Sequence, residues 1–228
     1  MPVAKRTWAL IFGVILGPVA AGAWLAFRGG SSDTSPDTGD EVSAGPWASG
    51  YRGDAWPDPL FWAAARGGAP CVRRLLREGV AADSGVGKGW TPLHIAALCG
   101  YVDVARLLLE AGADPQAATG NLITPLHCAC QGGHAMLVRL LVDHGADPNA
   151  RAADGRTPLH KAASYGHPGC IEALAEVGVG LNPRDADRYT PLDYAVQNEH
   201  AEAAATLHAL GGRRGATPRP ACQADGEH

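Results

Sequence analysis

The central part of the chain consists of short apolar periods separated by polar, turn-rich stretches. Apolar residues recur at intervals of three and four, first between Thr91 and Gly100 and then from about Val102 to Ala111. Threonine is a good helix N-cap, proline suits the first helical position, and glycine accepts the left-handed backbone at a helix end. The pattern predicts a short helix, a tight turn, a second short helix that stops at Gly112, and a projecting loop.

We expect each helix to bury one apolar face. In the second helix this apolar stripe consists of Val104, Ala105, Leu107 and Leu108. Helices this short are marginal in water by themselves, so their apolar faces must be buried by stacking one unit on the next.

The unit recurs along the chain at an interval of about 33 residues, a strong signal because period and motif must both match each time. Five units are predicted, starting near residues 58, 91, 124, 157 and 190. The sequence therefore predicts an all-α solenoid of five helix–turn–helix repeats over residues 57–212, with ten short helices in antiparallel pairs.

The units resemble ankyrin repeats. The shared features are the Thr-Pro-Leu-His start, the paired small residues behind it, the Leu-Leu pairs, the Gly-His turns and the Gly-Ala-Asp ends. The Gly-His turns are Gly133-His134 and Gly166-His167, and the Gly-Ala-Asp ends are 112–114 and 145–147. The resemblance covers roughly residues 58–212 and implies a solenoid that binds another protein.

The end units depart from the pattern, as terminal repeats that face water usually do. Unit one has Asp58 in place of threonine and Phe61 in place of histidine, and unit five has Asp193 in place of histidine and Glu199 in place of glycine. Unit four carries Glu-Val-Gly-Val-Gly-Leu-Asn instead of the Gly-Ala-Asp form, which leaves open whether its second helix or following loop sits differently.

In ankyrin repeats the partner usually lies against the loop tips and the exposed end of the first helix, on the concave side. Carried over to this sequence, the loop positions are Lys88, Trp90, Asn121, Ile123, Asp154, Arg156, Asp187 and Tyr189. The helix positions are Arg66, Leu98, Cys99, Gln131, Ser164, Tyr165, Gln197 and Asn198. Aromatic side chains and arginine are enriched in binding hot spots. The alternative to partner binding for Trp90 and Tyr189 is a structural role, in which they only cover loop backbone.

Two patterns suggest chemistry but do not meet its requirements. His94, His127 and His160 repeat like a row of metal ligands, yet equivalent positions in stacked units lie about 10 Å apart, whereas zinc–nitrogen bonds are about 2 Å long. The resemblance implies instead that this histidine serves a structural hydrogen-bond network. Residues 85–89, Gly-Val-Gly-Lys-Gly, lack the first glycine and the Ser or Thr of a phosphate loop. We predict no metal site, no cofactor and no enzymatic activity.

The charge balance argues against one further class of function. The chain has 228 residues, of which 18% are charged, and a formal net charge of −4. Nucleic-acid binding requires a basic surface that neutralises phosphates, so no nucleic-acid partner is expected. We expect a monomer.

Residues 1–28 form a separate apolar segment that follows Lys5 and Arg6 and has no further charge until Arg28. As a retained hydrophobic helix, residues 8–27 are long enough to span a membrane. As a signal peptide, the segment would be cleaved near Ala23. We favour the anchor, because cleavage would leave an apolar stub. The positive charges before the segment then place the repeats on the non-cytoplasmic side, whereas cleavage would leave them secreted or periplasmic.

The segments that flank the repeats are polar. Residues 29–56 are rich in Gly, Ser, Asp and Pro and predict a flexible linker with a typical span of about 30 Å. Within it, Trp47, Tyr51 and Trp56 are expected to fold onto the exposed face of unit one. Residues 213–228 predict a disordered tail.

The cysteines fit small buried hydrophobic residues better than a disulfide framework. Cys71 and Cys170 occupy the same core position in units three repeats apart, and Cys128 and Cys130 point to different sides of one short helix. Because buried thiols suit either compartment, the inverted topology, with the repeats in a reducing cytosol, stays open.

The main functional prediction is a protein–protein interaction module, tethered to a membrane or exported, that acts as scaffold, adaptor or inhibitor through its concave surface. The alternative is a thiol-based, redox-responsive exported protein that uses Cys99 at a helix end and Cys222 in the tail.

Overall fold

The computed structural model describes residues 58–215, a range that contains ten α-helices and no strand. The first helices of the five units are α3 (Pro59–Ala65), α5 (Pro92–Cys99), α7 (Pro125–Gly132), α9 (Pro158–Ser164) and α11 (Pro191–Gln197). The second helices are α4 (Ala69–Arg77), α6 (Val102–Glu110), α8 (Ala135–Asp143), α10 (Pro168–Glu176) and α12 (Ala201–Ala209). The prediction of an all-α solenoid with ten short helices in register is confirmed. The predicted N-terminal helix, the linker and residues 216–228 lie outside the described residues.

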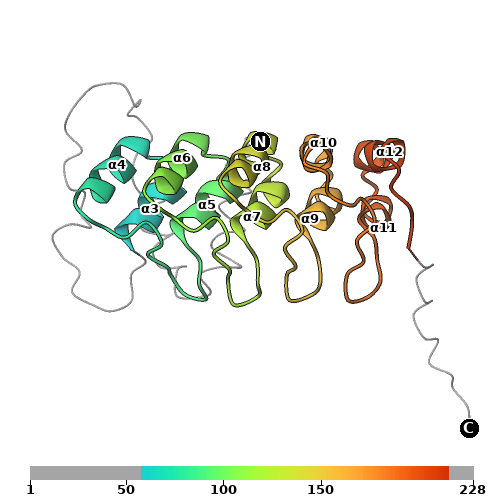
Figure 1. The fold of residues 1–228 in the computed structure, drawn as a ribbon, viewed down its shortest axis with the longest axis horizontal. Helices are drawn as coiled ribbons and strands as arrows, with labels where there is room; N and C mark the ends of the chain where they lie inside the picture. Colours follow the sequence, from blue (N-terminus) through green and yellow to red (C-terminus); the bar gives the residue numbers. More distant parts are fainter. Residues whose placement is uncertain (1–57, 216–228) are drawn as a thin grey trace, which may run out of the picture. The chain divides into compact units, whose positions relative to one another are not determined.

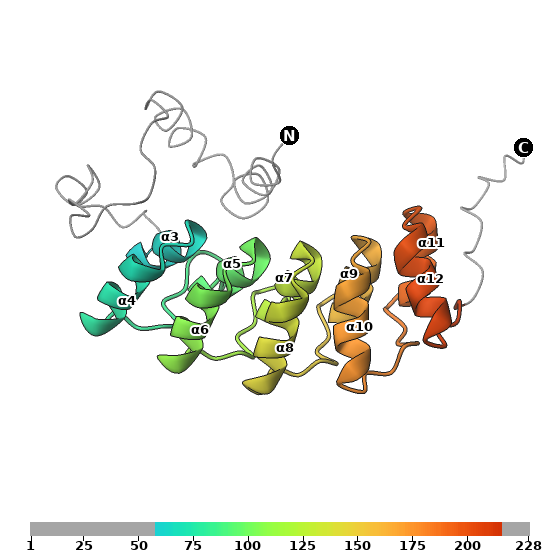
Figure 2. The ribbon, with the colours of Figure 1, turned by 90° about the horizontal axis from the view of Figure 1, so that it is seen from above.

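Each helix pair is stacked on the next, so that the repeats form two rows (Figure 1). A tight turn reverses the chain between the two helices of a unit, and the loops that join consecutive units project from one edge of the stack. Seen from above, the stack curves gently, and the first helices lie along its inner side (Figure 2). The first helices and the projecting loops therefore border the same concave side.

The start of each first helix is built by local chemistry. In unit two the backbone N–H of Thr91 donates to Nδ1 of His94 at 3.2 Å, and Pro92 occupies the first turn. The helix ends at Gly100, whose φ of 85° is left-handed. Units three and four begin with the same Thr–His capping box, so one local signal places all of these helices in register.

The core side of the second helix differs from the predicted stripe at one position. Val104, Ala105, Leu108 and Leu109 are buried, whereas Leu107 is only partly buried. The prediction that Leu107 is a core residue was wrong. Leu109 follows Ala105 by one helical turn and so shares its buried side, while Leu107 falls on the flank of the helix.

Unit four sits as the other units do, despite its different sequence. Helix α10 has the nine-residue length of the other second helices, and Gly178 ends it with a left-handed φ of 81°. Val179 is buried where Ala113 and Ala146 are buried in the two preceding units. The substitution therefore fills the same site with a larger apolar group and leaves the register unchanged.

The glycine that follows the first helix in units one to four is required for two reasons, its left-handed backbone and the close approach of a side chain from the next unit. Gly133 has a φ of 83°, and an added Cβ would lie only 2.7 Å from Nδ1 of His167 in the next unit. His167 is held there because its Nε2 lies 3.1 Å from the backbone oxygen of Gln131. Glu199 occupies the equivalent position in unit five with a φ of 60°. No sixth unit follows within the described range, so only the backbone strain remains at Glu199.

The C-terminal end of the stack is closed by the first residues of the predicted tail. The backbone N–H of Gly215 donates to Asp193 Oδ2 at 2.8 Å, and Arg214 Nε donates to Asp193 Oδ1 at 3.3 Å. Burial opposes ionisation of Asp193, but the hydrogen bonds from Thr190, Gly215 and Arg214 outweigh it and lower its pKa. A carboxylate suits the last unit because the chain segment beside it supplies donors, whereas the histidine of the inner units faces a carbonyl.

Candidate partner-binding face

Four hairpin loops connect consecutive units of the described chain, and all are closed in the same way. A backbone N–H at the start of each loop donates to the carbonyl four residues later. The four pairs are Val86 to Trp90 at 2.7 Å, Thr119 to Ile123 at 3.0 Å, Ala152 to Arg156 at 2.9 Å and Asp185 to Tyr189 at 3.1 Å. The loops are therefore ordered turns of equal shape.

Neighbouring loops are also hydrogen-bonded to each other through their backbones. The N–H of Gly120 donates to the carbonyl of Lys88 at 2.8 Å, that of Ala153 to Asn121 at 2.9 Å, and that of Ala186 to Asp154 at 3.1 Å. The projecting loops in Figure 1 thus form one connected array. Because backbone positions are fixed by these bonds, side chains at the tips are presented at regular intervals.

The repeated histidine supports this array from below. Since Nδ1 of His94 accepts from Thr91, its Nε2 carries the proton and donates to the carbonyl of Ile123 at 2.9 Å. His127 contacts the carbonyl of Arg156 at 3.1 Å, and His160 that of Tyr189 at 3.1 Å. Each histidine therefore holds the base of the loop that follows its own unit.

Burial sets the protonation of these rings. It lowers the pKa of His94 and of His127 to about 4, and the hydrogen bonds to the loop carbonyls only partly oppose this effect. A neutral imidazole with both nitrogens occupied has no lone pair to offer a metal. Among residues 58–215, no group of three or more His, Cys, Asp or Glu side chains is placed to hold a metal ion.

The loop tips present the predicted binding residues to solvent. Lys88, Asn121, Asp154 and Asp187 are all exposed, one on each loop. The backbone carbonyls of Lys88, Asn121 and Asp154 accept the hydrogen bonds between loops described above. Asp187 lies on the last loop of the described array. These four side chains are therefore accessible to a partner, and their role in binding stays a prediction.

The other four predicted loop residues are half-buried, and three of them contact a side chain of a first helix. The four are Trp90, Ile123, Arg156 and Tyr189. The ring of Trp90 is centred 5.5 Å from that of His94, and the ring of Tyr189 is 5.7 Å from that of Tyr194. Trp90 and Tyr189 therefore cover part of the helix starts and still leave surface exposed. Ile123 is also partly exposed.

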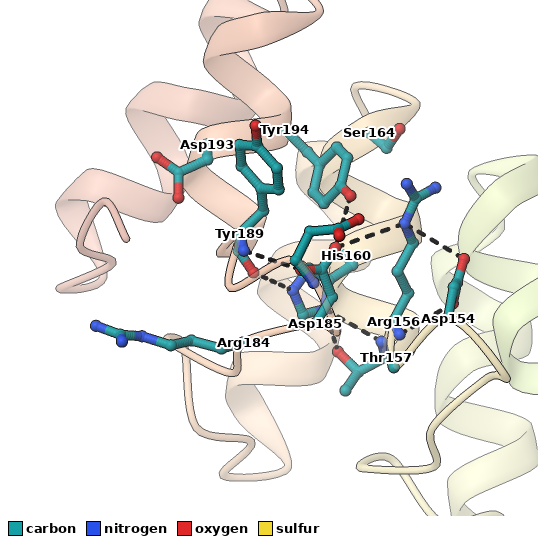
Figure 3. Close-up of polar contacts among 12 residues, drawn as sticks. Asp154, Arg156, Thr157, His160, Ser164, Arg184, Asp185, Tyr189, Asp193 and Tyr194 are labelled. Carbon is teal, nitrogen blue, oxygen red and sulfur yellow. Dashed lines mark hydrogen bonds and ion pairs between the residues drawn. The ribbon is translucent and has the colours of Figure 1, made fainter. Parts of the chain in front are cut away.

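Among these half-buried loop residues, Arg156 lies at the centre of a cluster of charged and aromatic side chains (Figure 3). Its guanidinium carbon lies 4.5 Å above the ring of Tyr194, and its Nε lies 3.4 Å from Asp154 Oδ2 and 3.8 Å from Asp185 Oδ2. The side chain of Asp185 is fully buried and accepts from the hydroxyl of Tyr194 at 2.6 Å and from the N–H of Tyr189 at 2.9 Å. The cluster locks the last two loops together.

Asp185 and Tyr194 did not emerge as important from the sequence. The signal was a departure from the repeat: Tyr194 stands where units two to four have Ile95, Cys128 and Lys161. Burial and the hydrogen bond to Asp185 raise the pKa of Tyr194, so its hydroxyl stays protonated and acts as a donor.

The helix residues of the predicted site differ in how far they are exposed to solvent. Arg66, Tyr165, Gln197 and Asn198 are exposed, while Cys99, Gln131 and Ser164 are partly buried. Leu98 is only 8% exposed because it belongs to the buried side of α5. It offers a partner almost no surface, so we remove it from the candidate site. The remaining loop and helix positions are called the concave face below.

Cys99 does not have the character of a reactive thiol. Burial raises its pKa to about 11, so the thiol is protonated at neutral pH. Thiolates rather than thiols are nucleophiles. Cys222, its proposed redox partner, lies outside the described residues.

Comparisons with known proteins agree with the repeat geometry. A family model described as ankyrin repeats, in three copies, matches residues 51–119 and 126–213. No curated protein matches the chain. None of the helices within residues 58–215 combines the length and apolar character required to cross a membrane. The predicted anchor, residues 8–27, lies outside that range.

Proposed function

Because the chain belongs to the ankyrin repeat family, whose repeats are protein–protein interaction modules, we propose that its concave face binds another protein. The repeats act by shape and side-chain complementarity, and we propose no catalytic role. In this proposal the protein is a scaffold, adaptor or inhibitor that is held at a membrane or exported.

The connected loop array is the observation that carries this proposal. Binding loses less conformational entropy when the contact residues are already held in place. The backbone bonds between loops and the histidine bonds beneath them fix the tips before any partner arrives. The exposed tip side chains are Lys88, Asn121, Asp154 and Asp187, and of these Asp154 also pairs with Arg156 within the fold.

Tyr165 is the sharpest probe of this face. Its side chain is 42% exposed, and within residues 58–215 no hydrogen bond, ion pair or ring contact holds it. We expect Tyr165→Ala to weaken binding of a purified partner about thirtyfold, the loss typical of a hot spot. We expect the free energy of unfolding to change by under about 0.5 kcal/mol. Affinity by calorimetry and stability by urea unfolding test the two halves.

Met136→Ala is the matched control, because Met136 is 68% exposed on α8, in the row of second helices. It should leave both quantities unchanged. The partner is first identified by cross-linking in the native host. Normal affinity in Tyr165→Ala, or an equal loss in Met136→Ala, would place the binding site elsewhere on the stack.

The tethering half of the proposal rests on the apolar segment 8–27, whose length suits a membrane span. We expect the mature protein to remain with the membrane fraction and to retain this segment. The intact mass of protein purified from its host checks this expectation. A mature chain that starts at Trp24 would replace the anchor by a cleaved signal peptide.

A further inference from the structure

The last loop and the end segment of the described chain border a cavity with a cationic lining. The cavity lies beside the last unit, has a volume of about 350 Å³ and is open to solvent. Three of the residues that line it are arginines, and none of the described lining residues is acidic. The lining consists of Asn182, Arg184, Thr190, Gly211, Arg213 and Arg214. Because the whole chain has a net charge of −4, this concentration of positive charge is local.

Backbone hydrogen bonds hold two of these arginines at the cavity. The N–H of Arg213 donates to Asn182 Oδ1, and the carbonyl of Arg213 accepts from the hydroxyl of Thr190 at 2.9 Å. The carbonyl of Arg184 accepts from Nη1 of Arg151 at 2.8 Å. None of these bonds uses the guanidinium group of Arg184 or Arg213, so the fold fixes their backbones and leaves their side chains available.

Two of the three guanidinium groups lack a compensating charge. Arg214 Nε lies 3.3 Å from Asp193 Oδ1. Among residues 58–215, no hydrogen bond or ion pair engages the side chain of Arg184 or Arg213, and both side chains are exposed. In Figure 3 the side chain of Arg184 extends away from the network of the last two loops, and no dashed line reaches its guanidinium. The cavity therefore carries about two uncompensated positive charges.

The repeat does not require arginine at position 213. In the inner units the N–H at this place also donates to a side chain of the preceding loop, as the N–H of Asp114 does to Asp83 at 3.0 Å. The residues at this place are Asp114 and Asp147 in two of those units, so Arg213 reverses the charge. The backbone bond is kept while the side chain changes sign, and this change is not explained by the fold.

Arg184 also differs in use from its counterparts in the other loops. Gly85 and Ala118 occupy its place in the first two loops, and Arg151 occupies it in the third. Nη1 of Arg151 donates to the carbonyls of Gly155 and Arg184, so this guanidinium joins its own loop to the next. No further loop follows Arg184 within the described range, and its guanidinium is left for a ligand.

We propose that this cavity binds the phosphate group of a phosphate monoester, with Arg184 and Arg213 as its main contacts. A monoester carries nearly two negative charges at neutral pH and has three strong acceptor oxygens, which matches the two uncompensated guanidinium groups. Guanidinium groups bind phosphate oxygens in a bidentate manner. A carboxylate has one charge and two oxygens, and would leave one arginine uncompensated.

The site is open, so the phosphate belongs either to a modified side chain of another protein or to a small phosphate ester. Arg184, Arg213 and Arg214 are not part of the concave face. The proposal therefore stands or falls independently of partner binding there.

The test is calorimetric titration of the full chain with methyl phosphate at neutral pH and constant ionic strength. We expect saturable binding with a Kd of about 1 mM or below. Methyl sulfate has the same shape but one negative charge, and it should bind about fivefold more weakly. A phosphoserine peptide that binds more tightly than methyl phosphate would identify a modified protein as the source of the phosphate. Equal affinity for the two would identify a small phosphate ester.

Arginine variants locate the site. Arg184→Ala and Arg213→Ala should each weaken methyl phosphate binding about tenfold. Because both side chains are exposed, each variant should keep its melting temperature within about 2 °C of the wild type. Arg213→Lys keeps the charge but loses the planar fork, so its affinity should lie between those of the wild type and Arg213→Ala. Arg73→Ala is the matched control, since it removes an exposed arginine from α4 in the first unit and should leave the affinity unchanged.

Three results would overturn the proposal: no saturable binding in the millimolar range, equal affinity for methyl sulfate, or equal losses in Arg184→Ala and Arg73→Ala. Binding that appears only after Asp225→Asn and Glu227→Gln would overturn it as well, because carboxylates of the chain itself would then occupy the cavity.

Discussion

Replacing Leu108 by alanine is expected to lower the free energy of unfolding by about 2–5 kcal/mol, the range for a buried leucine that leaves a cavity. Leu108 is 0% exposed and lies in α6, which contacts α4, α5 and α8. The stack on both sides limits how far neighbours can move to fill the space, so the loss should lie well inside that range. Urea unfolding measures it.

Leu107→Ala is the matched control, because it removes the same atoms from the adjacent position of the same helix. Leu107 is partly exposed, so we expect it to lose less than half as much stability as Leu108→Ala. Equal losses for the two variants would mean that the helix faces the core through Leu107 as the sequence suggested. Variation of the midpoint at constant slope would show that stability, not compactness, had changed.

The helices were predictable because their signals are local. A cap residue, a proline in the first turn and a glycine at the end lie within a few residues of each other, as at Thr91, Pro92 and Gly100, and they recur with the period. The stripe was less predictable because Leu107, Leu108 and Leu109 are all leucine. A continuous apolar run does not tell which of its members faces the neighbouring units.

The loop tips were predictable for a different reason. Their position in the repeat determines exposure, and Lys88, Asn121, Asp154 and Asp187 follow that rule. The cluster of Asp185, Arg156 and Tyr194 was not predictable, because it depends on side chains from two loops and a helix that replace the repeat's usual residues together.

Contacts between residues at different repeat positions in successive units were the hardest to predict from the sequence. Nε2 of His167 lies 3.1 Å from the backbone oxygen of Gln131 only because the stacking register brings the start of one second helix against the end of the preceding first helix. The role of residues 213–215 also depends on stacking, since Asp193 needs donors where the array ends. Sequence periodicity describes equivalent positions and says little about such pairs.

Acid is expected to unfold the repeats well before their carboxylates are protonated. His94 and His127 are fully buried, and burial lowers the pKa of each from 6.5 to about 4. A group whose pKa is lower in the folded state takes up its proton preferentially in the unfolded state. The stability contributed by these neutral rings is therefore complete above about pH 6.5 and is lost as the pH falls towards 4.

The size of the effect follows from the two shifts. Each is worth on the order of 3 kcal/mol between neutral pH and pH 4, a large share of the stability of a typical domain. His134, His160 and His167 have pKa values lowered by burial as well and act in the same direction. Asp193 does not contribute in this window, because its pKa is already below the ordinary value of 3.8.

Urea unfolding at pH 7.5, 6 and 5 measures this dependence, and we expect a loss of at least about 2 kcal/mol per pH unit near pH 5. His127→Gln replaces one titrating ring by a neutral side chain of similar reach. It should be less stable than the wild type at pH 7.5, since the bonds to Thr124 and the Arg156 carbonyl are disturbed. It should also show a slope shallower by about one proton. Equal stability of the wild type at pH 7.5 and pH 5 would mean that these rings are not held neutral, and the histidine support of the loop array would then have to be abandoned.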